Sequence, residues 1–374
     1  MRQILFRISL VEPWLWWKDQ LNDWPLLGSA WVCLLVAVIF FAYHALRRHT
    51  QVLRDKSTWA TFGVMLIALT LAPRWFPVPA SVPVYGYGMM VLLGFVCGLW
   101  FAVTRGRAVG YNPEIIMDSA FWILITGVAG GRLAFLVQYG SEVFRPGMSW
   151  GEMLLKAVNL SEGGLVLLGA LVGGGLGVFG YFTYRKLKVF EFADLLMPAV
   201  FIGVGFGRIG CLLNGCCFGD RCQLPWGITF PAGTVTYNIL VERGFVDPTA
   251  LATMPLHPTQ IYSSLDGFLL ALVTAIYYWY RKHPGDVLAL GCILYSITRF
   301  LIEFLRADEM GQLGTGLTIS QLYSLGIMAL GLILLFTGPW RGPARRLQKM
   351  PAGPSPDNIS ASSDKIQVRA VETY

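Results

Sequence analysis

Residues 203–219 read GVGFGRIGCLLNGCCFG, and this stretch decides how the chain folds. Its first part is glycine-rich and apolar, which predicts a closely packed helix, and it carries a single arginine, Arg208. A cationic side chain on such a helix is costly in hydrocarbon unless it faces a polar cavity or an anionic partner. The helix then runs into Asn214 and a group of cysteines. The stretch is therefore the first candidate for a functional site.

The composition surrounding this stretch is that of a membrane protein. The chain has 374 residues, of which 55% are hydrophobic and only 14% are charged, whereas a soluble domain carries roughly a quarter charged residues. Its apolar runs approach the length of about 20 residues that crosses a bilayer. The net charge of +7 is spread over short loops. A nucleic-acid partner is therefore not expected, because such partners need a concentrated basic face.

The apolar runs predict nine membrane spans and an all-α integral membrane fold. An N-terminal extension, 1–80, holds two extra transmembrane helices after a Trp-rich interfacial lead-in, a seven-helix transferase-like core covers 81–338, and a disordered cytoplasmic tail covers 339–374. The predicted spans are 29–46 and 58–73 in the extension, then 84–104, 118–138, 163–184, 194–213, 259–280, 286–305 and 317–338 in the core.

Lys and Arg are concentrated in alternate loops, which fixes a predicted orientation. The loops after the first, third, fifth and seventh spans are the basic ones. By the positive-inside rule the N-terminus lies outside and the C-terminus is cytoplasmic. The end of the Arg208 helix, its cysteines and the long loop 214–258 are then on the outer side. A loop of this length is expected to serve as a lid or substrate-facing cap.

Other charged residues interrupt the later spans. Arg299 and Glu303 are four residues apart and share a helical face, which Tyr295 extends by another turn. This pair is either part of a binding cavity or a structural ion pair between helices. Arg132 lies near the outer end of its span, where it either faces the cavity or extends to the interface.

Asp194 and Asp266 add two more acidic groups at or near membrane depth. Several buried charges in different helices predict a polar cavity inside the bundle. Arginines match phosphate oxygens with paired donors, and a cavity open to the outer leaflet admits a head group while the acyl chains stay in the bilayer. The glycine runs GVAGG, GALVGGGLG and GVGFG predict close helix packing. These features indicate a protein that handles an anionic phospholipid.

Four of the seven cysteines lie within a dozen residues: Cys211, Cys216, Cys217 and Cys222. On the oxidising side of a membrane such thiols form disulfides, and three pairings are open. A disulfide-fastened loop is the preferred interpretation, followed by free thiols. A metal site ranks third because the spacing is not CxxC…CxxC and no histidine is close. No metal and no cofactor are expected.

Several segments resemble the prolipoprotein diacylglyceryl transferase family. GRIGCLLNGCCFG resembles its GRxGNFxNGExxG signature, LHPTQIYSSLDG its HPSQLYE segment, YSITRFLIEFLRAD its YGxFRFxxEFxRxPD, and GLTISQLYSL its GLSxGQxLS. Upstream, YGYGMMVLLGF, GVAGGRLAFLVQY and SEGGLVLLGALVGG are similar to family segments in the same order. The matches cover about residues 84–338, and the chain is identified as a divergent member.

The resemblance implies transfer of a diacylglyceryl group from phosphatidylglycerol to the lipobox cysteine of a prolipoprotein, in the bacterial inner membrane. The implied partners are phosphatidylglycerol, lipoprotein precursor signal peptides and membrane lipid. A thiolate would attack the glycerol carbon while glycerol phosphate leaves. The implied catalytic residues are Arg208, Arg299 and Glu303. The implied substrate-binding residues are Arg132, Tyr87, Asn214, His257, Gln260 and Tyr295.

The sequence departs from the family pattern near the presumed acid–base step. The family histidine proposed as the base aligns with Leu168, which cannot accept a proton. The family asparagine after GRxG is Cys211 here, the glutamate of NGE is Cys216, and the glutamate after HPSQLY is Ser263.

Three explanations follow from these departures. His257 or Tyr87 replaces the base, or the arginine field alone activates the incoming thiol. Alternatively, the chain is a paralogue that acts on another acceptor. The third explanation is that the chain is a non-catalytic or repurposed protein that binds or moves anionic phospholipid.

Overall fold

The computed structural model describes residues 4–9, 18–19, 25–36, 63–64, 66–67, 81–144, 148–159, 164, 166–306 and 316–337. The chain divides into two compact units. The first is Met1–Val96 with Gly203–Leu265 and Phe304–Met310, and the second is Cys97–Ile202 with Asp266–Glu303 and Gly311–Tyr374. Residues 29–36, the start of the first predicted span, are helical. Most of the second predicted span and the predicted tail, 339–374, lie outside the described residues.

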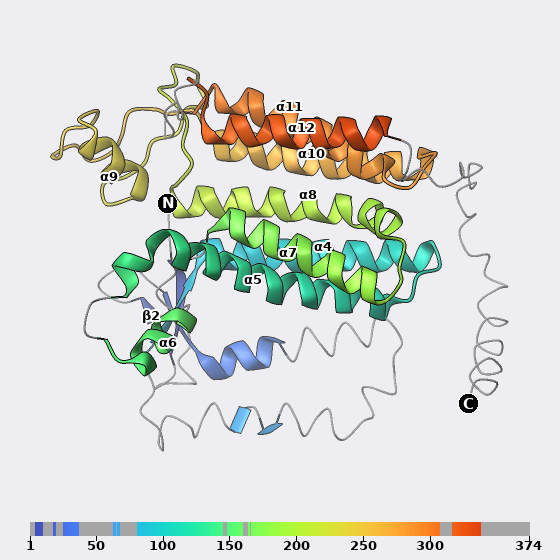
Figure 1. Cartoon of the computed structure of the whole chain (residues 1–374). Helices are drawn as coiled ribbons and strands as arrows, with labels where there is room; N and C mark the ends of the chain where they lie inside the picture. Colours follow the sequence, from blue (N-terminus) through green and yellow to red (C-terminus); the bar gives the residue numbers. More distant parts are fainter. Residues whose placement is uncertain are drawn as a thin grey trace. The chain divides into compact units, whose positions relative to one another are not determined.

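All seven predicted core spans are helices. The helices are α4 (Gly86–Ala108), α5 (Pro113–Val143), α6 (Trp150–Val158), α7 (Leu167–Tyr184), α8 (Val189–Asn214), α9 (Val235–Glu242), α10 (Thr259–Tyr280), α11 (Asp286–Glu303) and α12 (Ile319–Phe336) (Figure 1). Among the described residues, five are long and apolar enough to cross a membrane: α4, α5, α8, α10 and α12. The chain is a multi-pass helical membrane protein, as the composition predicted.

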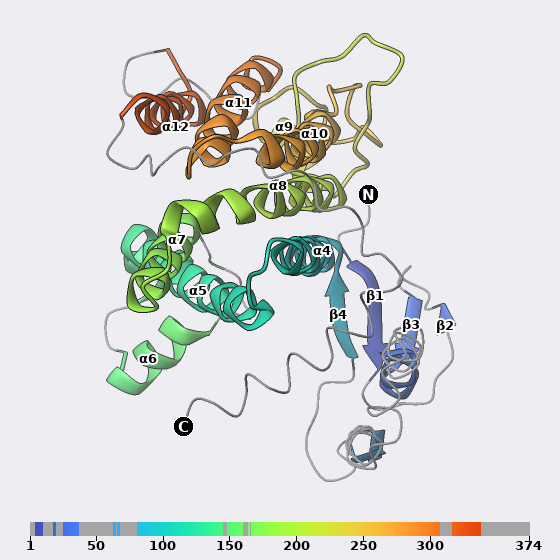
Figure 2. The same ribbon diagram turned by 90° about the vertical axis from the view of Figure 1, so that its right-hand side faces the viewer.

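A small four-stranded sheet, which the sequence pattern did not predict, precedes α4. Its strands are β1 (Ile4–Ser9), β2 (Lys18–Asp19), β3 (Pro25–Gly28) and β4 (Ser81–Tyr85), in the order β2-β3-β1-β4 (Figure 2). β1 pairs parallel with β3 and antiparallel with β4. The segment predicted as an interfacial lead-in therefore contains strands, because the β-branched and aromatic residues of ILFRIS suit a pleated surface.

Glycines bring α5 and α7 side by side, as both views show (Figures 1 and 2). A Cβ atom on Gly130 would lie 2.9 Å from the Cα atom of Gly173. No side chain larger than hydrogen fits this approach without displacing the backbone. The packing interpretation of these two glycine runs is confirmed.

Glycines play the same part between α4 and α8 in the first unit. A Cβ atom on Gly94 would lie 2.9 Å from the Cβ atom of Phe206 and 3.3 Å from the Cα atom of Gly203. One on Gly210 would lie 3.0 Å from Cδ2 of Tyr87. The GVGFG run therefore packs closely against α4 and holds Tyr87 beside the last turns of α8.

Asp194 is a structural residue of the second unit. It is completely buried and accepts hydrogen bonds from the Arg281 guanidinium and from three backbone amides at the start of α11, those of Gly285, Val287 and Leu288. The expectation that Asp194 marks a polar cavity is wrong. Its oxygens are used to pair a buried cation and to cap a helix, because backbone donors at a helix start need acceptors.

The loop 214–258, predicted to serve as a lid or substrate-facing cap, is a folded segment, and that role stays a prediction. It contains α9, whose first turn is capped by the Thr234 hydroxyl. Its apolar side chains form a cluster of their own: Phe218, Phe230, Tyr237, Leu240, Val246 and Leu256. A loop with its own core keeps a defined shape, so it can position side chains at the end of α8.

Candidate functional site

The end of α8 gathers three cysteines. After Asn214 the chain turns sharply, and Gly215 (φ 71°) and Cys217 (φ 60°) both adopt left-handed backbone conformations. This conformation is easy for glycine but strained for cysteine. The turn brings Cys216 and Cys217 back towards Cys211, so that the three Sγ atoms all lie within 4.8 Å of one another.

Cationic and polar side chains surround these thiols. Arg208 and Arg306 both interact electrostatically with Cys217. Tyr87, from α4, interacts with Arg208 and with the three thiols, and Asn214 makes a side-chain hydrogen bond to Cys216. The structure thus brings together three of the predicted site residues, Tyr87, Arg208 and Asn214. With Arg306 and the three cysteines they form what we call the thiol–arginine cluster: Tyr87, Arg208, Cys211, Asn214, Cys216, Cys217 and Arg306.

The thiol of Cys217, which follows the helix, has a perturbed acidity. Hydrogen bonds from the Cys211 and Cys216 thiols lower the pKa of Cys217, because they stabilise its thiolate. The guanidinium groups of Arg306 and Arg208 lower this pKa further, whereas burial opposes the shift. The cluster therefore favours negative charge on the sulfur of Cys217 rather than on those of its two thiol donors, and the pKa of the Cys216 thiol is raised.

The start of α10 fastens the cysteine turn. The Gln260 side chain donates from Nε2 to the carbonyl oxygen of Cys216 at 2.8 Å, and the Thr259 hydroxyl donates to that of Cys217 at 2.8 Å. Gln260 is only 1% exposed, and its Oε1 has no hydrogen-bond partner among the described residues. The structure places this predicted residue against the cluster, with one amide oxygen still able to accept a hydrogen bond.

His257 lies beside the same turn and is half-buried. Its Nδ1 is 3.4 Å from the hydroxyl oxygen of Tyr262. Its backbone carbonyl accepts from the Gly219 amide at 3.1 Å and its amide donates to Asp220 at 2.8 Å. The backbone of His257 is thus part of the local structure, and a role for its ring as a base stays a prediction.

In the second unit, Arg299 and Glu303 form a buried ion pair on one face of α11. Arg299 Nη2 also donates to Ser320 Oγ at 2.8 Å, and the Thr318 hydroxyl donates to Glu303 Oε1 at 2.9 Å. Thr318 is the N-cap of α12. The pair therefore joins α11 to the start of α12, as the structural alternative predicted. Arg299 Nε has no hydrogen-bond partner among the described residues.

Tyr295 lies on α11 and Asp266 on α10, both within this unit. The Tyr295 ring lies with its centroid 6.1 Å from that of Phe201, so it contributes to apolar packing. The Thr298 hydroxyl donates to Asp266 Oδ2 at 2.9 Å. Within this unit the structure brings Arg299 and Glu303 into contact, while a substrate role for Tyr295 stays a prediction.

Arg132 caps the C-terminal end of α6. It donates to the carbonyl oxygens of Lys156, Ala157 and Gly164 at 2.6, 2.8 and 3.0 Å. A cation is favourable there because the last carbonyls of a helix carry partial negative charge. Arg132 also lines an apolar hollow of about 550 Å³ with Leu124, Ile125, Val128, Ala129, Leu133, Leu136, Ala157 and Val158. A substrate role for Arg132 stays a prediction.

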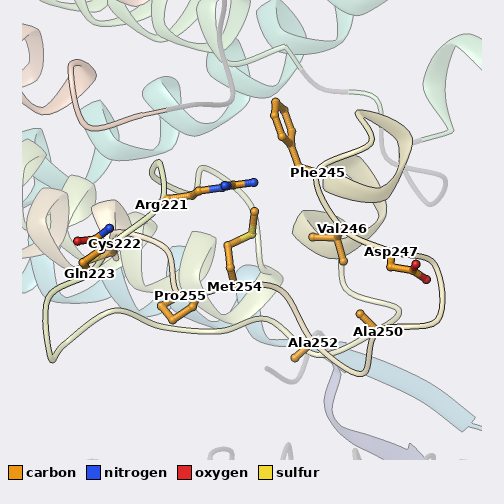
Figure 3. A pocket seen from close by; sticks show the side chains of 10 residues that line it. All are labelled: Arg221, Cys222, Gln223, Phe245, Val246, Asp247, Ala250, Ala252, Met254 and Pro255. Atoms are coloured by element: carbon orange, nitrogen blue, oxygen red, sulfur yellow. The ribbon is translucent and has the colours of Figure 1, made fainter.

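The folded loop contains a second hollow, of about 430 Å³ (Figure 3). The Arg221 guanidinium lies 5.9 Å from the centre of the Phe245 ring across it, and Asp247 and Met254 are among its other lining residues. The buried Cys222 also lines it, away from the other three thiols. All four cysteines are free, so the preferred disulfide interpretation is wrong for this structure.

Three further polar residues of these groups were not predicted from the sequence: Arg306, Ser320 and Thr318. Each lies inside a segment already singled out, since Arg306 follows Glu303 by three residues and the other two belong to GLTISQLYSL. Their segments gave the signal, but their contacts depend on how distant parts of the chain meet.

The chain is similar to known proteins over most of its length. The model of a family described as prolipoprotein diacylglyceryl transferase matches residues 73–337. The chain is 35% identical to phosphatidylglycerol–prolipoprotein diacylglyceryl transferase 2 of Clostridium perfringens, over 67% of this chain and 90% of that relative. It is 34% identical to the phosphatidylglycerol–prolipoprotein diacylglyceryl transferase of Clostridium tetani, over 67% of this chain and 92% of that relative. It is also 26% identical to the phosphatidylglycerol–prolipoprotein diacylglyceryl transferase of Rhodopirellula baltica. This match covers 97% of this chain and 94% of that relative, so it includes the N-terminal region.

Proposed function

The chain belongs to the prolipoprotein diacylglyceryl transferase family, and from this premise we propose that it transfers the diacylglyceryl group of phosphatidylglycerol to the cysteine thiol of a lipoprotein precursor. The relatives' names support the reaction and its lipid. The acceptor thiol loses its proton, its sulfur attacks a glyceryl carbon, and the carbon–oxygen bond to phosphate breaks. The oxygen leaves as glycerol phosphate.

One observation carries the proposal. Arg208 lies in the last turns of an apolar helix within the thiol–arginine cluster, and both Arg208 and Arg306 interact electrostatically with the thiol of Cys217. Guanidinium groups pair with phosphate oxygens through two parallel donors. We assign these arginines to the phosphate of the lipid, whose leaving group gains charge as the carbon–oxygen bond breaks. Fixed donors at the site of developing charge are the largest single source of catalysis in many enzymes.

Arg299 and Glu303 serve the reaction as a second polar group, within their own unit. Glu303 and Ser320 fix the Arg299 guanidinium through its Nη atoms, and Nε remains to donate to an anionic oxygen. Tyr295 bounds this group one turn earlier. A buried guanidinium held this firmly loses little side-chain entropy when it binds an anion.

The other predicted residues are assigned to substrate binding. Gln260 offers a buried amide oxygen beside the cluster, and His257, Asn214 and Tyr87 complete that side. The apolar hollow beside Arg132 has the lining expected for an acyl chain. The hollow of the folded loop has a cation and a ring suited to the precursor peptide.

We further propose that the chain resides in the bacterial inner membrane with its N-terminus outside and its C-terminus in the cytoplasm. The distribution of Lys and Arg supports this orientation. It places the end of α8 and the folded loop on the outer face, where a precursor's lipobox emerges. α6 supports an interfacial position for its neighbourhood, because Trp150, Leu154 and Leu155 are 88%, 67% and 74% exposed on a short amphipathic helix.

Transfer of radiolabelled diacylglyceryl from phosphatidylglycerol to a lipobox peptide tests the proposal. Arg208→Ala should lower the rate by about 100-fold or more, whereas Arg107→Ala, at an exposed arginine in the last turn of α4, should leave it unchanged. A native chain that binds the lipid without transferring it would instead support the lipid-binding alternative raised by Leu168, which lies in the first turn of α7.

A further inference from the structure

Three half-buried thiols at the end of α8 form an arrangement that the transfer reaction as described above does not use. The Sγ atoms of Cys211, Cys216 and Cys217 are mutually within 4.8 Å and free. Two of them replace the asparagine and glutamate of the family segments quoted above. The chain also has Leu168 where those segments place a basic histidine. The sequence thus gains these thiols while it lacks the histidine that the family resemblance assigns to deprotonating the acceptor.

The spacing of the thiols fits a metal ion. A tetrahedral zinc ion with Zn–S bonds of about 2.3 Å places its sulfur ligands about 3.8 Å apart. The three Sγ atoms lie within 4.8 Å of one another, so small side-chain rotations would bring them to the distance that zinc requires. The left-handed conformation of Cys217 directs its thiol to the same point as the other two, and the Thr259 hydroxyl holds that turn through the Cys217 carbonyl.

The charges and hydrogen bonds around the thiols also suit a metal thiolate. Three thiolates and one divalent cation carry a net charge of −1, which Arg208 and Arg306 compensate. Asn214 hydrogen-bonds the Cys216 side chain, and Gln260 holds the Cys216 carbonyl. Such outer contacts orient metal ligands. Soft sulfur ligands select zinc over magnesium or calcium, which prefer oxygen.

We propose that Cys211, Cys216 and Cys217 bind one Zn²⁺ through three thiolates and leave the fourth tetrahedral position for the sulfur of the acceptor cysteine. Zinc sites with three protein ligands and one open position are the catalytic type. The open position is accessible because all three thiols are only half-buried.

The role of the open position rests on the proposed function. When the acceptor thiol binds the ion, its proton passes to water, because a coordinated thiol is deprotonated. The thiolate sulfur then forms a bond to the glyceryl carbon as the carbon–oxygen bond breaks, and the electron pair leaves on glycerol phosphate. The product thioether is uncharged and a weaker ligand, so it dissociates. Zinc thus supplies what Leu168 cannot.

Metal analysis of the purified full-length chain in reduced, lipid-containing buffer tests the site without any activity. The native chain and Cys97→Ser, a control in α4 outside the cluster, should each retain about one zinc ion per chain. Cys211→Ser, Cys216→Ser and Cys217→Ser should each bind zinc at least tenfold more weakly. Cobalt in place of zinc should give sulfur-to-metal charge-transfer bands in the native chain that each cysteine variant weakens.

Chelation of the native chain avoids any dependence on whether the variants fold. Removing zinc should lower transfer at least 100-fold, and adding zinc back should restore it. Absence of zinc binding at micromolar free zinc, or a disulfide among the three cysteines in the active protein, would overturn the metal site. Full transfer by the chelated chain would overturn it too, while leaving the proposed function intact. Zinc binding without transfer would overturn the proposed function and leave the metal site.

Discussion

Arg281 Nη1 donates to Asp194 Oδ2 at 3.1 Å, and both side chains are almost completely buried. The same carboxylate accepts three backbone amides at the start of α11. A single buried acid thus neutralises a cation and satisfies a helix terminus. The relationship explains why two charges are tolerated within an apolar unit.

We expect Asp194→Asn to destabilise the protein by about 3 kcal/mol, because breaking a buried pair leaves an uncompensated charge. Thermal unfolding in a fixed detergent measures the change. Glu242→Gln, at an exposed acid at the end of α9, is the control and should have no effect. Equal melting temperatures for Asp194→Asn and the native chain would show that the pair contributes nothing.

We expect Glu303→Gln to lower transfer by about 100-fold with a smaller loss of stability, because the guanidinium of Arg299 loses the charge that fixes it. The conservative variant Arg299→Lys should also fall short of the native transfer rate, since an ammonium group cannot replace a guanidinium fork. Rates and melting temperatures are measured on the same preparations. If stability falls while the rate per folded molecule is unchanged, the pair has only a structural role.

The lowered pKa of Cys217 predicts unusual reactivity in the metal-free protein. An ordinary thiol, with a pKa near 8.5, is almost fully protonated at pH 6. Cys217 should therefore react with iodoacetamide at a rate that changes little between about pH 6 and pH 8. Mass spectrometry of the labelled site measures the rate, and a denatured sample is the control. A rate that rises tenfold per pH unit over this range would exclude the thiolate.

The same shift has a defined effect on stability. Because the folded pKa lies below the unfolded value, the thiolate contributes stability that is fully present above about pH 8.5 and lost as pH falls towards the folded pKa. Cys217→Ser removes the contribution. The difference in melting temperature between the metal-free native chain and this variant should therefore shrink as the solution is acidified.

We expect Gly173→Leu to lower the melting temperature clearly, because even its Cβ atom would lie 3.0 Å from the Cα atom of Gly130 and force α5 and α7 apart. Gly175→Leu is the matched control two residues away, since nothing lies within 4 Å of a Cβ atom there. Similar melting temperatures for the two variants would contradict the close packing of these helices.

The sequence was sufficient to predict the helical membrane core. Long apolar runs have few alternatives in lipid, because every backbone amide and carbonyl must be satisfied within the segment. All seven predicted core spans are helices in the expected order, and within the described residues five of these helices are long and apolar enough to cross a membrane. The glycine runs also predicted close helix packing, since small residues serve this purpose in membranes. The short strands before α4 were missed, because strand pairing depends on distant partners such as β1 and β4.

The roles of individual charges were decided by the tertiary structure. The sequence presented Arg132, Asp194 and Arg299 as similar intramembrane charges. In the structure, Arg132 caps α6, Asp194 caps α11 and pairs with Arg281, and Arg299 joins α11 to α12. A buried charge takes whatever partner the fold brings to it, and the sequence does not specify which segments meet.

The cysteines also show which features can be predicted from the sequence and which depend on the tertiary structure. Four cysteines within a dozen residues, at the end of a glycine-rich helix that bears Arg208, are evident from the sequence alone. Only the folded turn at Gly215 and Cys217 decided that three of them converge while Cys222 lines a separate hollow. Composition and hydrophobic length are local properties and are written in the sequence. Convergence of side chains depends on backbone angles and on contacts between distant segments, which are fixed only when the whole chain has packed.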